Sequence, residues 1–262
     1  MLLLLDRLGQ RLLVGLKGLL YGLGYFARLL VESFRFFGRG RVGRDVLVMQ
    51  ILFTGLEALP VVGILALAIG VAINLIGSSV LAGFGQGQVA YTLLIIVITK
   101  ELGPLLTAFI VTARSGTAIA IELGGMSVSH ELEAYVAVGA DPIASLAAPR
   151  FIGVVMSLLL LDIYFNIFGL LGSFGVLQLL HPVALDEYFR KLLAVLKPAD
   201  LVWGLVKSLI FGAIISVVAT YRGFAVERAS TEIPVAGIRA VGSSFILVII
   251  ADAIITAAAY SR

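Results

Sequence analysis

Long apolar stretches without a charged residue set the hydropathy pattern of this chain. No Asp, Glu, Lys or Arg occurs between Glu57 and Lys100, or between Asp162 and Asp186. Roughly 20 helical residues cross a bilayer hydrocarbon core that is about 30 Å thick. The first stretch therefore has room for two spans and the second for one. This pattern predicts an all-α membrane protein with several spans.

Five membrane-spanning helices are predicted from the same pattern. They are expected near residues 57–78, 89–112, 151–178, 200–220 and 240–260. The uncharged, Gly- and Ser-rich segment between the first two spans predicts a short exposed turn. Residues 46–262 are therefore predicted to form one membrane domain.

The first 45 residues have a different pattern. Residues 1–45 contain eight of the 19 basic residues, and leucines recur at helical spacing from Leu8 to Leu23. This combination is typical of an N-terminal amphipathic helix that lies along a membrane surface. The alternative is a sixth span from Leu12 to Val31, which its glycines and flanking charges disfavour.

The longest polar segment between spans covers residues 113–150 and has a helical pattern of its own. Ser127 is placed to cap a helix, and Gly139 is placed to end it. Leu132 and Val136 lie on one side of that helix. We predict a short cytoplasmic amphipathic helix between the second and third spans.

Basic residues are shared unevenly between the two sides that five spans create. With the N-terminus inside, the inner segments hold 13 of the 19 Lys and Arg residues and the outer segments hold four. Cytoplasmic segments of membrane proteins carry an excess of Lys and Arg. We therefore expect a cytoplasmic N-terminus and a C-terminus on the opposite side.

Composition narrows the function classes. The chain is 60% apolar and 13% charged, whereas roughly 25% of a soluble domain is charged. The net charge of +3 fits the orientation bias, and the basic and aromatic platforms that bind nucleic-acid single strands are missing. We expect no nucleic-acid partner. Without Cys and with only two His, no metal site is expected either.

Five ionisable residues fall within the predicted spans: Lys100, Glu101, Asp162, Lys207 and Asp252. A charge inside a bilayer costs at least a few kcal/mol, so such residues usually face a protein interior or aqueous cavity and pair with one another. Lys207 and Asp252 lie at similar depths in the last two spans, which predicts that they pair. We expect Lys100, Glu101 and Asp162 to lie deeper in the same polar region. The alternative is a structural ion pair without substrate contact.

Two further features concern mechanism. Pro104 interrupts the second predicted span and is expected to bend it, either beside a cavity or as a packing kink. The phosphate-loop motif G-x-x-x-x-G-K-[ST] does not occur in the sequence. We therefore expect that this chain is not an enzyme and that any ATP hydrolysis takes place in another subunit.

Several short motifs follow one another between Lys100 and Val155. They are ELGP, the R-x-G after it, E-L-G-x-M from Glu122, E-x-x-A from Glu131, Asp141-Pro142 and Pro149-Arg150-Phe151. In this order the motifs closely resemble the MlaE permease family of ABC transporters. The similarity extends more weakly over the rest of the chain.

The resemblance implies a homodimeric, multi-pass permease in the inner membrane of a double-membraned bacterium. Its substrate would be glycerophospholipid, moved between the inner and outer membranes to maintain outer-membrane lipid asymmetry. The implied partners are a second copy of the chain, a MlaF-like ATPase that binds ATP and magnesium, a MlaB-like STAS protein and a MlaD-like hexamer of MCE domains. No cofactor is expected in this chain itself.

The resemblance also assigns roles to residues. Four acidic residues would help to hold or present the helix that couples to the ATPase: Glu122, Glu131, Glu133 and Asp141. Their alternative role is a solvated acidic face.

The intramembrane positions Lys100, Glu101, Lys207 and Asp252 match family positions near the lipid pathway or the subunit contact. Relatives often have arginine at position 100, and lysine lacks the two-pronged geometry of that side chain. The family motif Q-G-Y near the end of the first span is replaced by residues around Ser78, so pocket residues of that helix are not carried over.

A second class of function stays open on the sequence alone. An ion-coupled secondary transporter would use Glu101, Asp162 and Asp252 as proton or cation sites. That mechanism predicts inverted repeats, which the sequence does not reveal. A purely structural anchor would leave the five ionisable residues unexplained.

Overall fold

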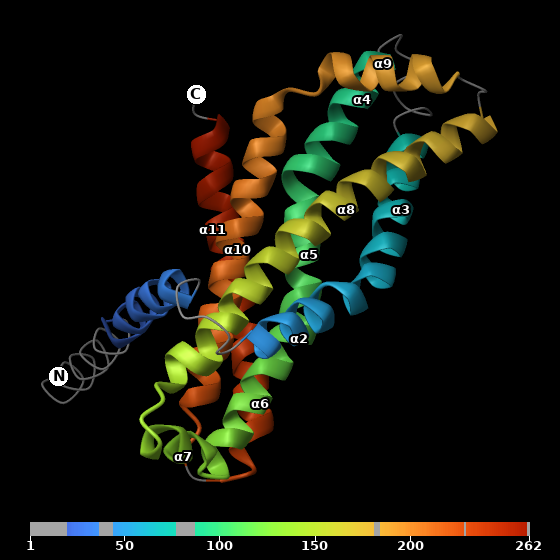
Figure 1. The fold of residues 1–262 in the computed structure, drawn as a ribbon. Helices are drawn as coiled ribbons and strands as arrows, with labels where there is room; N and C mark the ends of the chain where they lie inside the picture. Colours follow the sequence, from blue (N-terminus) through green and yellow to red (C-terminus); the bar gives the residue numbers. More distant parts are fainter. Residues whose placement is uncertain (1–19, 37–43, 77–86, 181–183, 228, 261–262) are drawn as a thin grey trace, which may run out of the picture.

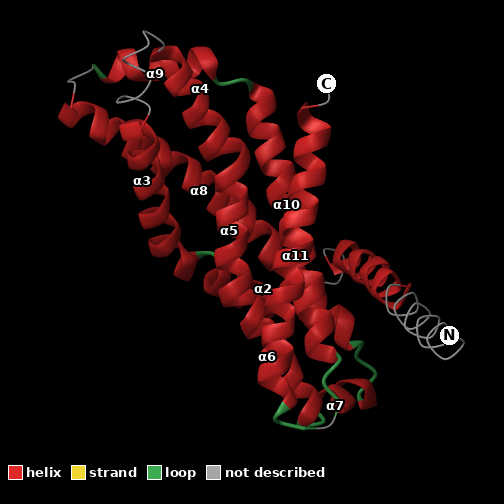
Figure 2. Ribbon diagram, turned by 180° about the vertical axis from the view of Figure 1, so that it is seen from behind, coloured by secondary structure: helices red, strands yellow, loops and turns green. Residues whose placement is uncertain are grey.

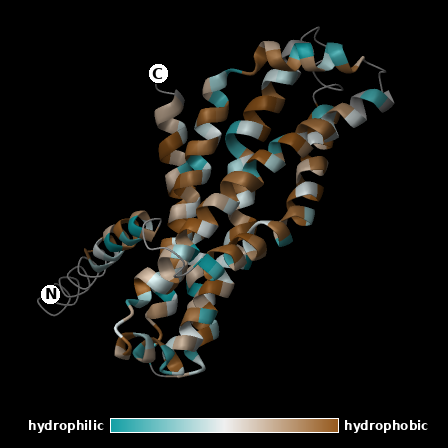
Figure 3. Cartoon of the chain, in the orientation of Figure 1, coloured by the Kyte–Doolittle hydropathy of each residue, from teal (hydrophilic) through white to brown (hydrophobic). Residues whose placement is uncertain are grey.

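The computed structural model describes residues 20–36, 44–76, 87–180, 184–227 and 229–260 (Figure 1). In these ranges all regular elements are helices, which confirms the expected all-α class (Figure 2). Apolar residues cover most of the long helices (Figure 3). Five segments are long and apolar enough to cross a membrane: Arg44–Ile76, Tyr91–Val128, Ile143–Gly175, Pro198–Phe224 and Glu232–Ala259.

The first span consists of α2 (Arg44–Thr54) and α3 (Leu59–Ile76), joined by a single 3₁₀ turn. The span begins at Arg44, whereas the sequence pattern predicted a start near residue 57. Glu57 marked the predicted boundary, but the Arg114 side chain donates hydrogen bonds to its carboxylate and backbone oxygens. A paired charge of this kind does not end the span.

The second span changes helical type along its length. Its parts are α4 (Gly87–Ile95), a π-helical segment (Ile96–Leu102), α5 (Gly103–Val111), a second π-helical segment (Thr112–Gly116) and α6 (Thr117–Val128). The prediction ended this span near residue 112 and placed a cytoplasmic loop after it. Instead the helix continues to Val128.

The short helix predicted from Ser127 begins later, as α7 (Glu131–Ala137). Ser127 is not its cap, because that residue lies near the end of α6 and its hydroxyl donates to the Val226 carbonyl. The turn into α7 is made by His130, whose φ of 59° is left-handed. Gly139, with φ of 80°, follows the helix end as predicted.

Four more helices follow α7 along the chain. They are α8 (Ala148–Leu180), α9 (Leu185–Val195), α10 (Pro198–Phe224) and α11 (Glu232–Tyr260). In Figure 1, α7 and α9 lie at opposite ends of the molecule, while α10 and α11 run side by side. The final span begins at Glu232 rather than near residue 240, so its first turns belong to the α7 end.

Helices α8 and α10 form the centre of the bundle. On α8, Leu158, Leu161 and Phe165 follow helical spacing and are at most 1% exposed, and on α10 Phe211 and Ile215 are fully buried. The two helices pack against each other. In addition, α8 packs against α3 and α2, and α10 packs against α11 and α6. This apolar packing fixes the positions of the charged side chains described below.

Small residues let helices approach closely, as in other membrane bundles. A Cβ atom added to Gly70 of α3 would lie 2.0 Å from the Gly169 carbonyl oxygen of α8. Such a distance leaves no room for any side chain. The glycine therefore sets the distance between the first and third spans.

A helix over residues 20–36 lies outside the bundle, beside its α7 half (Figure 1). Tyr25 packs edge-on against Tyr221 and Phe224 of α10, and burial raises the pKa of the Tyr25 hydroxyl. Arg28 forms an ion pair with Asp141, at 3.0 Å. Most of the leucine pattern predicted for the amphipathic helix lies in residues 1–19, outside the described residues.

Candidate functional site

Lys207 of α10 is the centre of a charged cluster built from three spans. Its side chain is 2% exposed, and its Nζ atom donates to Glu101 Oε2 at 2.7 Å and to Thr256 Oγ1 at 2.7 Å. The same atom lies 2.8 Å from Asp252 Oδ1 of α11. The predicted pair between Lys207 and Asp252 is therefore confirmed, and Glu101 is a second carboxylate partner.

The cluster holds two carboxylates for one ammonium group. The side chains of Glu101 and Asp252 are 28% and 17% exposed, whereas that of Lys207 is nearly enclosed. A buried cation needs such partners, because an unpaired charge in a low-dielectric interior costs several kcal/mol. The geometry encloses the cation and leaves carboxylate oxygens at the accessible edge.

The π-helical segment before Pro104 gives Glu101 its position. Proline lacks the N–H that an α-helix would use, and the wider π turn precedes it directly. Gly204 of α10 approaches the same segment, since a Cβ there would lie 2.7 Å from the Thr99 carbonyl oxygen. The predicted interruption at Pro104 is confirmed, and α10 packs against it.

Lys100 does not lie in the Lys207 cluster, contrary to the sequence prediction. Successive side chains on a helix point about 100° apart, and Lys100 pairs with Asp200 Oδ1 at 3.1 Å. Asp200 also accepts a hydrogen bond from the Lys197 backbone N–H at the start of α10. Asp200 lies seven residues before Lys207 on α10, and therefore about 10 Å closer to the α9 end of the molecule.

Asp162 of α8 is 2% exposed and lies behind the π-helical segment. Its Oδ1 atom is 3.0 Å from where a Cβ on Gly103 would be, and its Oδ2 atom is 3.7 Å from that of Gly204. Asn166 donates a hydrogen bond to the Asp162 carbonyl oxygen at 2.8 Å. Asp162 therefore adjoins the helices of the cluster, while the ion pairs of Lys207 are with Glu101 and Asp252.

The four acidic residues that the family resemblance assigned to coupling separate into two groups. Glu122 of α6 accepts from Arg150 Nη2 at 2.7 Å, and Asp141 pairs with Arg28. These two carboxylates connect neighbouring helices. Glu131 and Glu133 instead have local partners around α7, a serine hydroxyl and a histidine ring.

Helix α7 exposes one face, while Leu132 and Tyr135 on its other face are partly buried against the core. None of its residues is buried, and the apolar side chains of Val136 and Val138 are 62% and 81% exposed. Exposed apolar groups beside charged ones are typical of a protein contact surface. The α7 surface is defined as Glu131, Glu133, Val136 and Val138.

Sequence reasoning missed two features of the opposite end. Asp200 was not recognised as a partner because it lies at a span boundary, where charges are common. The sequence pattern predicts no helix between the third and fourth spans, yet α9 forms there, and its Tyr188 and Leu192 lie one turn apart on a single face and are both buried. The Tyr188 hydroxyl donates to the Leu170 carbonyl oxygen at 3.0 Å, which fastens α9 to α8.

The five spans and the cluster around Lys207 between them define a multi-span α-helical membrane protein with paired ionisable groups inside the bundle. Comparison of the sequence with known families narrows the class. The family described as Permease MlaE matches residues 47–258, and this chain belongs to that family.

Relatives cover most of the chain. A probable ABC transporter permease protein of Rickettsia prowazekii is 30% identical over 214 residues, 81% of this chain and 82% of its own length. The intermembrane phospholipid transport system permease protein MlaE of Haemophilus influenzae is 28% identical over 81% of this chain and 82% of its own. The chloroplastic protein TRIGALACTOSYLDIACYLGLYCEROL 1 of Arabidopsis thaliana is 27% identical, over 83% of this chain and 62% of its own length.

Proposed function

We propose that this chain is the membrane-spanning permease subunit of an ABC transporter that moves glycerophospholipids between the inner and outer membranes of a bacterium. The family match over residues 47–258 carries this proposal, and the name of the Haemophilus relative states intermembrane phospholipid transport. An amphipathic lipid needs apolar walls with a few charges at defined depth. The cluster around Lys207 has that character.

The proposal places the N-terminus in the cytoplasm and the C-terminus in the periplasm. The excess of basic residues in the segments of the α7 end supports this orientation. In this orientation the α7 surface faces the cytoplasm, where an ATPase subunit would bind ATP and magnesium. A second copy of the chain completes the permease, and STAS-domain and MCE-domain proteins are its further partners.

Lys207, Glu101 and Asp252 are proposed to lie along the lipid pathway. Their three spans meet at one buried ammonium group, so a movement of α11 relative to α10 changes an ion pair. ATP-driven movement of the α7 end would reach this cluster through α6 and α10, which pack together. Lipid binding and ATP hydrolysis would thus be linked by continuous helices.

Purification from the native membrane in mild detergent, followed by mass spectrometry of bound proteins and lipids, tests this proposal. We expect an ATPase subunit and glycerophospholipid to copurify with the chain. A matched preparation of the Val138→Asp variant, altered on the α7 surface, should keep the lipid and lose the ATPase. A lone protein whose transport follows a proton gradient without ATP would contradict the proposal and favour the ion-coupled alternative.

A further inference from the structure

A cavity of about 490 Å³ opens between α2, α6 and the start of α8, away from the Lys207 cluster. Its polar end is formed by Asp45, Gln50, Glu122 and Arg150, and its apolar part includes Met49 and Phe53. We infer that this cavity binds one phospholipid of the cytoplasmic leaflet, with a zwitterionic headgroup that carries an amine. The site is separate from the proposed transport pathway.

The guanidinium of Arg150 supplies the phosphate-binding group. Its side chain is only 5% exposed, its Nη1 donates to the Leu146 carbonyl oxygen at 2.9 Å, and its Nη2 donates to Glu122 at 2.7 Å. A guanidinium has five N–H donors, so these two bonds leave others for a ligand. A fixed, buried arginine loses little side-chain entropy when it binds a phosphate.

The charge of the lining selects the headgroup. Among the described residues that line the cavity, Arg150 is the one cation, and Asp45 and Glu122 are two carboxylates; the Glu122 side chain is 57% exposed. An anionic lipid would meet this acidic excess, whereas a zwitterion brings both a phosphate for the guanidinium and an ammonium for the carboxylates. Charge complementarity therefore favours an aminophospholipid over an anionic lipid.

The apolar part of the cavity suits an acyl chain. Met49 is 65% exposed and Phe53 is 36% exposed, although both belong to a span. Helix α2 packs along α8 so closely that a Cβ on Gly153 would lie 2.7 Å from the Gln50 side chain. The cavity therefore opens on the α6 side of α2, where an acyl chain can lie along Met49 and Phe53.

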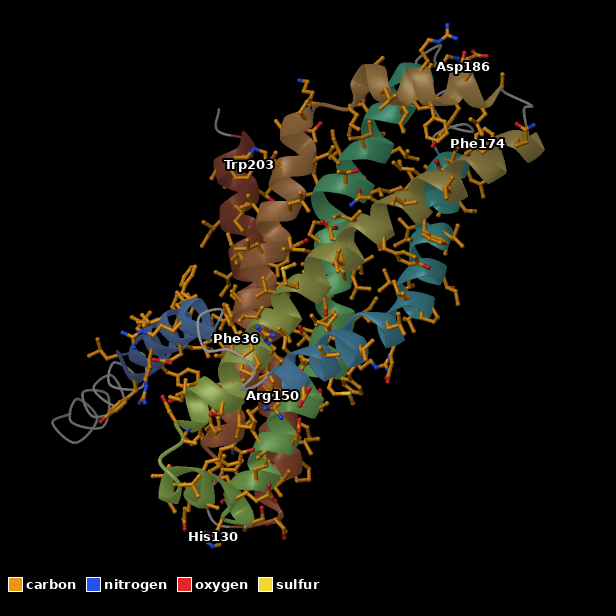
Figure 4. All side chains as sticks on the ribbon, viewed as in Figure 1. Phe36, His130, Arg150, Phe174, Asp186 and Trp203 are labelled. Atoms are coloured by element: carbon orange, nitrogen blue, oxygen red, sulfur yellow. The ribbon has the colours of Figure 1, made fainter. Side chains whose placement is uncertain are left out.

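The depth of the cavity fits the headgroup layer. In Figure 4, Arg150 lies below Phe36, which is at the end of the outer N-terminal helix, and between His130 and Asp186 at the two ends of the molecule. Asp45 is in the first turn of the first span. A phosphate at Arg150 would thus be at the membrane surface, with its acyl chains pointing toward the bilayer core.

The test uses the full chain, reconstituted in vesicles of equal parts phosphatidylethanolamine and phosphatidylglycerol and then extracted again in mild detergent. Mass spectrometry measures the ratio of the two bound lipids. We expect phosphatidylethanolamine to be enriched about five-fold over the vesicle composition, which corresponds to about 1 kcal/mol for one partly exposed ion pair. Arg150 is buried and its replacement can prevent folding, so variants of the exposed lining decide the test.

The double variant Asp45→Asn and Glu122→Gln should remove the enrichment, and Met49→Trp should displace the bound lipid by filling the apolar part. The control Met156→Trp adds the same bulk at a position that is 46% exposed but outside this cavity, and should keep the enrichment. Equal binding of both lipids by the unaltered chain, or an enrichment that survives both cavity variants, would overturn the inference. Copurification of an ATPase with the Met49→Trp variant would be unaffected, because Met49 has no role in the proposed ATPase contact, so the proposed function stands or falls separately.

Discussion

Replacement of Lys207 by methionine removes the cation that pairs with both Glu101 and Asp252. Methionine has nearly the same length and stays apolar, so the change leaves two carboxylates side by side with little loss of packing. Breaking a buried ion pair by removing one partner costs about 3 to 5 kcal/mol. Because the carboxylates are 28% and 17% exposed, water offsets part of the cost and we expect about 3 kcal/mol.

Thermal unfolding in detergent measures this loss. For a chain of this size about 1 kcal/mol shifts Tm by about 2 to 4 °C, so Lys207→Met should lower Tm by about 6 to 12 °C. Lys191→Met is the matched control, because Lys191 pairs with Glu187 on the exposed surface of α9. An exposed pair one helical turn apart contributes little to stability because solvent screens it, so the control should shift Tm by no more than about 2 °C.

A second variant decides between lost packing and uncompensated charge. Adding Asp252→Asn to Lys207→Met removes one of the two unpaired carboxylates and should recover part of the lost Tm. The reasoning is refuted if Lys207→Met shifts Tm no more than Lys191→Met does. It also fails if the double variant unfolds at or below the temperature of the single variant.

Two more predictions concern packing and the α7 surface. Gly70→Ala should separate α3 from α8 and lower Tm by several degrees in thermal unfolding, because the added Cβ would lie 2.0 Å from a backbone oxygen. The control Gly125→Ala should leave Tm unchanged or slightly raised, because nothing lies within 4 Å of its added Cβ. Val138→Asp should reduce ATPase copurification at least about ten-fold, as expected for a central contact residue. The control Leu193→Asp, at a strongly exposed position of α9, should leave ATPase copurification unchanged. An equal loss of ATPase with both variants would contradict the assignment of the α7 surface.

Much of the fold was predictable because bilayer thickness imposes a length on apolar segments. The charge-free stretch after Glu57 located the first two spans, and matching depths paired Lys207 with Asp252. Both inferences use only a rise per residue and the cost of an unpaired charge. They needed no knowledge of side-chain packing.

The features that escaped prediction depend on tertiary contacts. The charge of Glu57 suggested a span boundary. Because Glu57 is paired with Arg114, which is far away in the sequence, the first span extends on both sides of Glu57. Lys100 and Glu101 are neighbours in sequence, yet the helical turn directs them to different carboxylates, and only the fold brings Asp200 within reach of Lys100. Sequence spacing therefore placed the charged residues in the correct spans and assigned only some of their partners.

Reconstituted lipid transfer tests the central claim most directly. The chain and its copurifying ATPase are placed in donor vesicles together with the remaining copurified subunits, and fluorescent phospholipid is followed into acceptor vesicles. The account predicts transfer that requires ATP and magnesium and that falls sharply with Lys207→Met but not with Lys191→Met. Transfer that continues without ATP, or an ATP-dependent transport of ions without lipid, would contradict it.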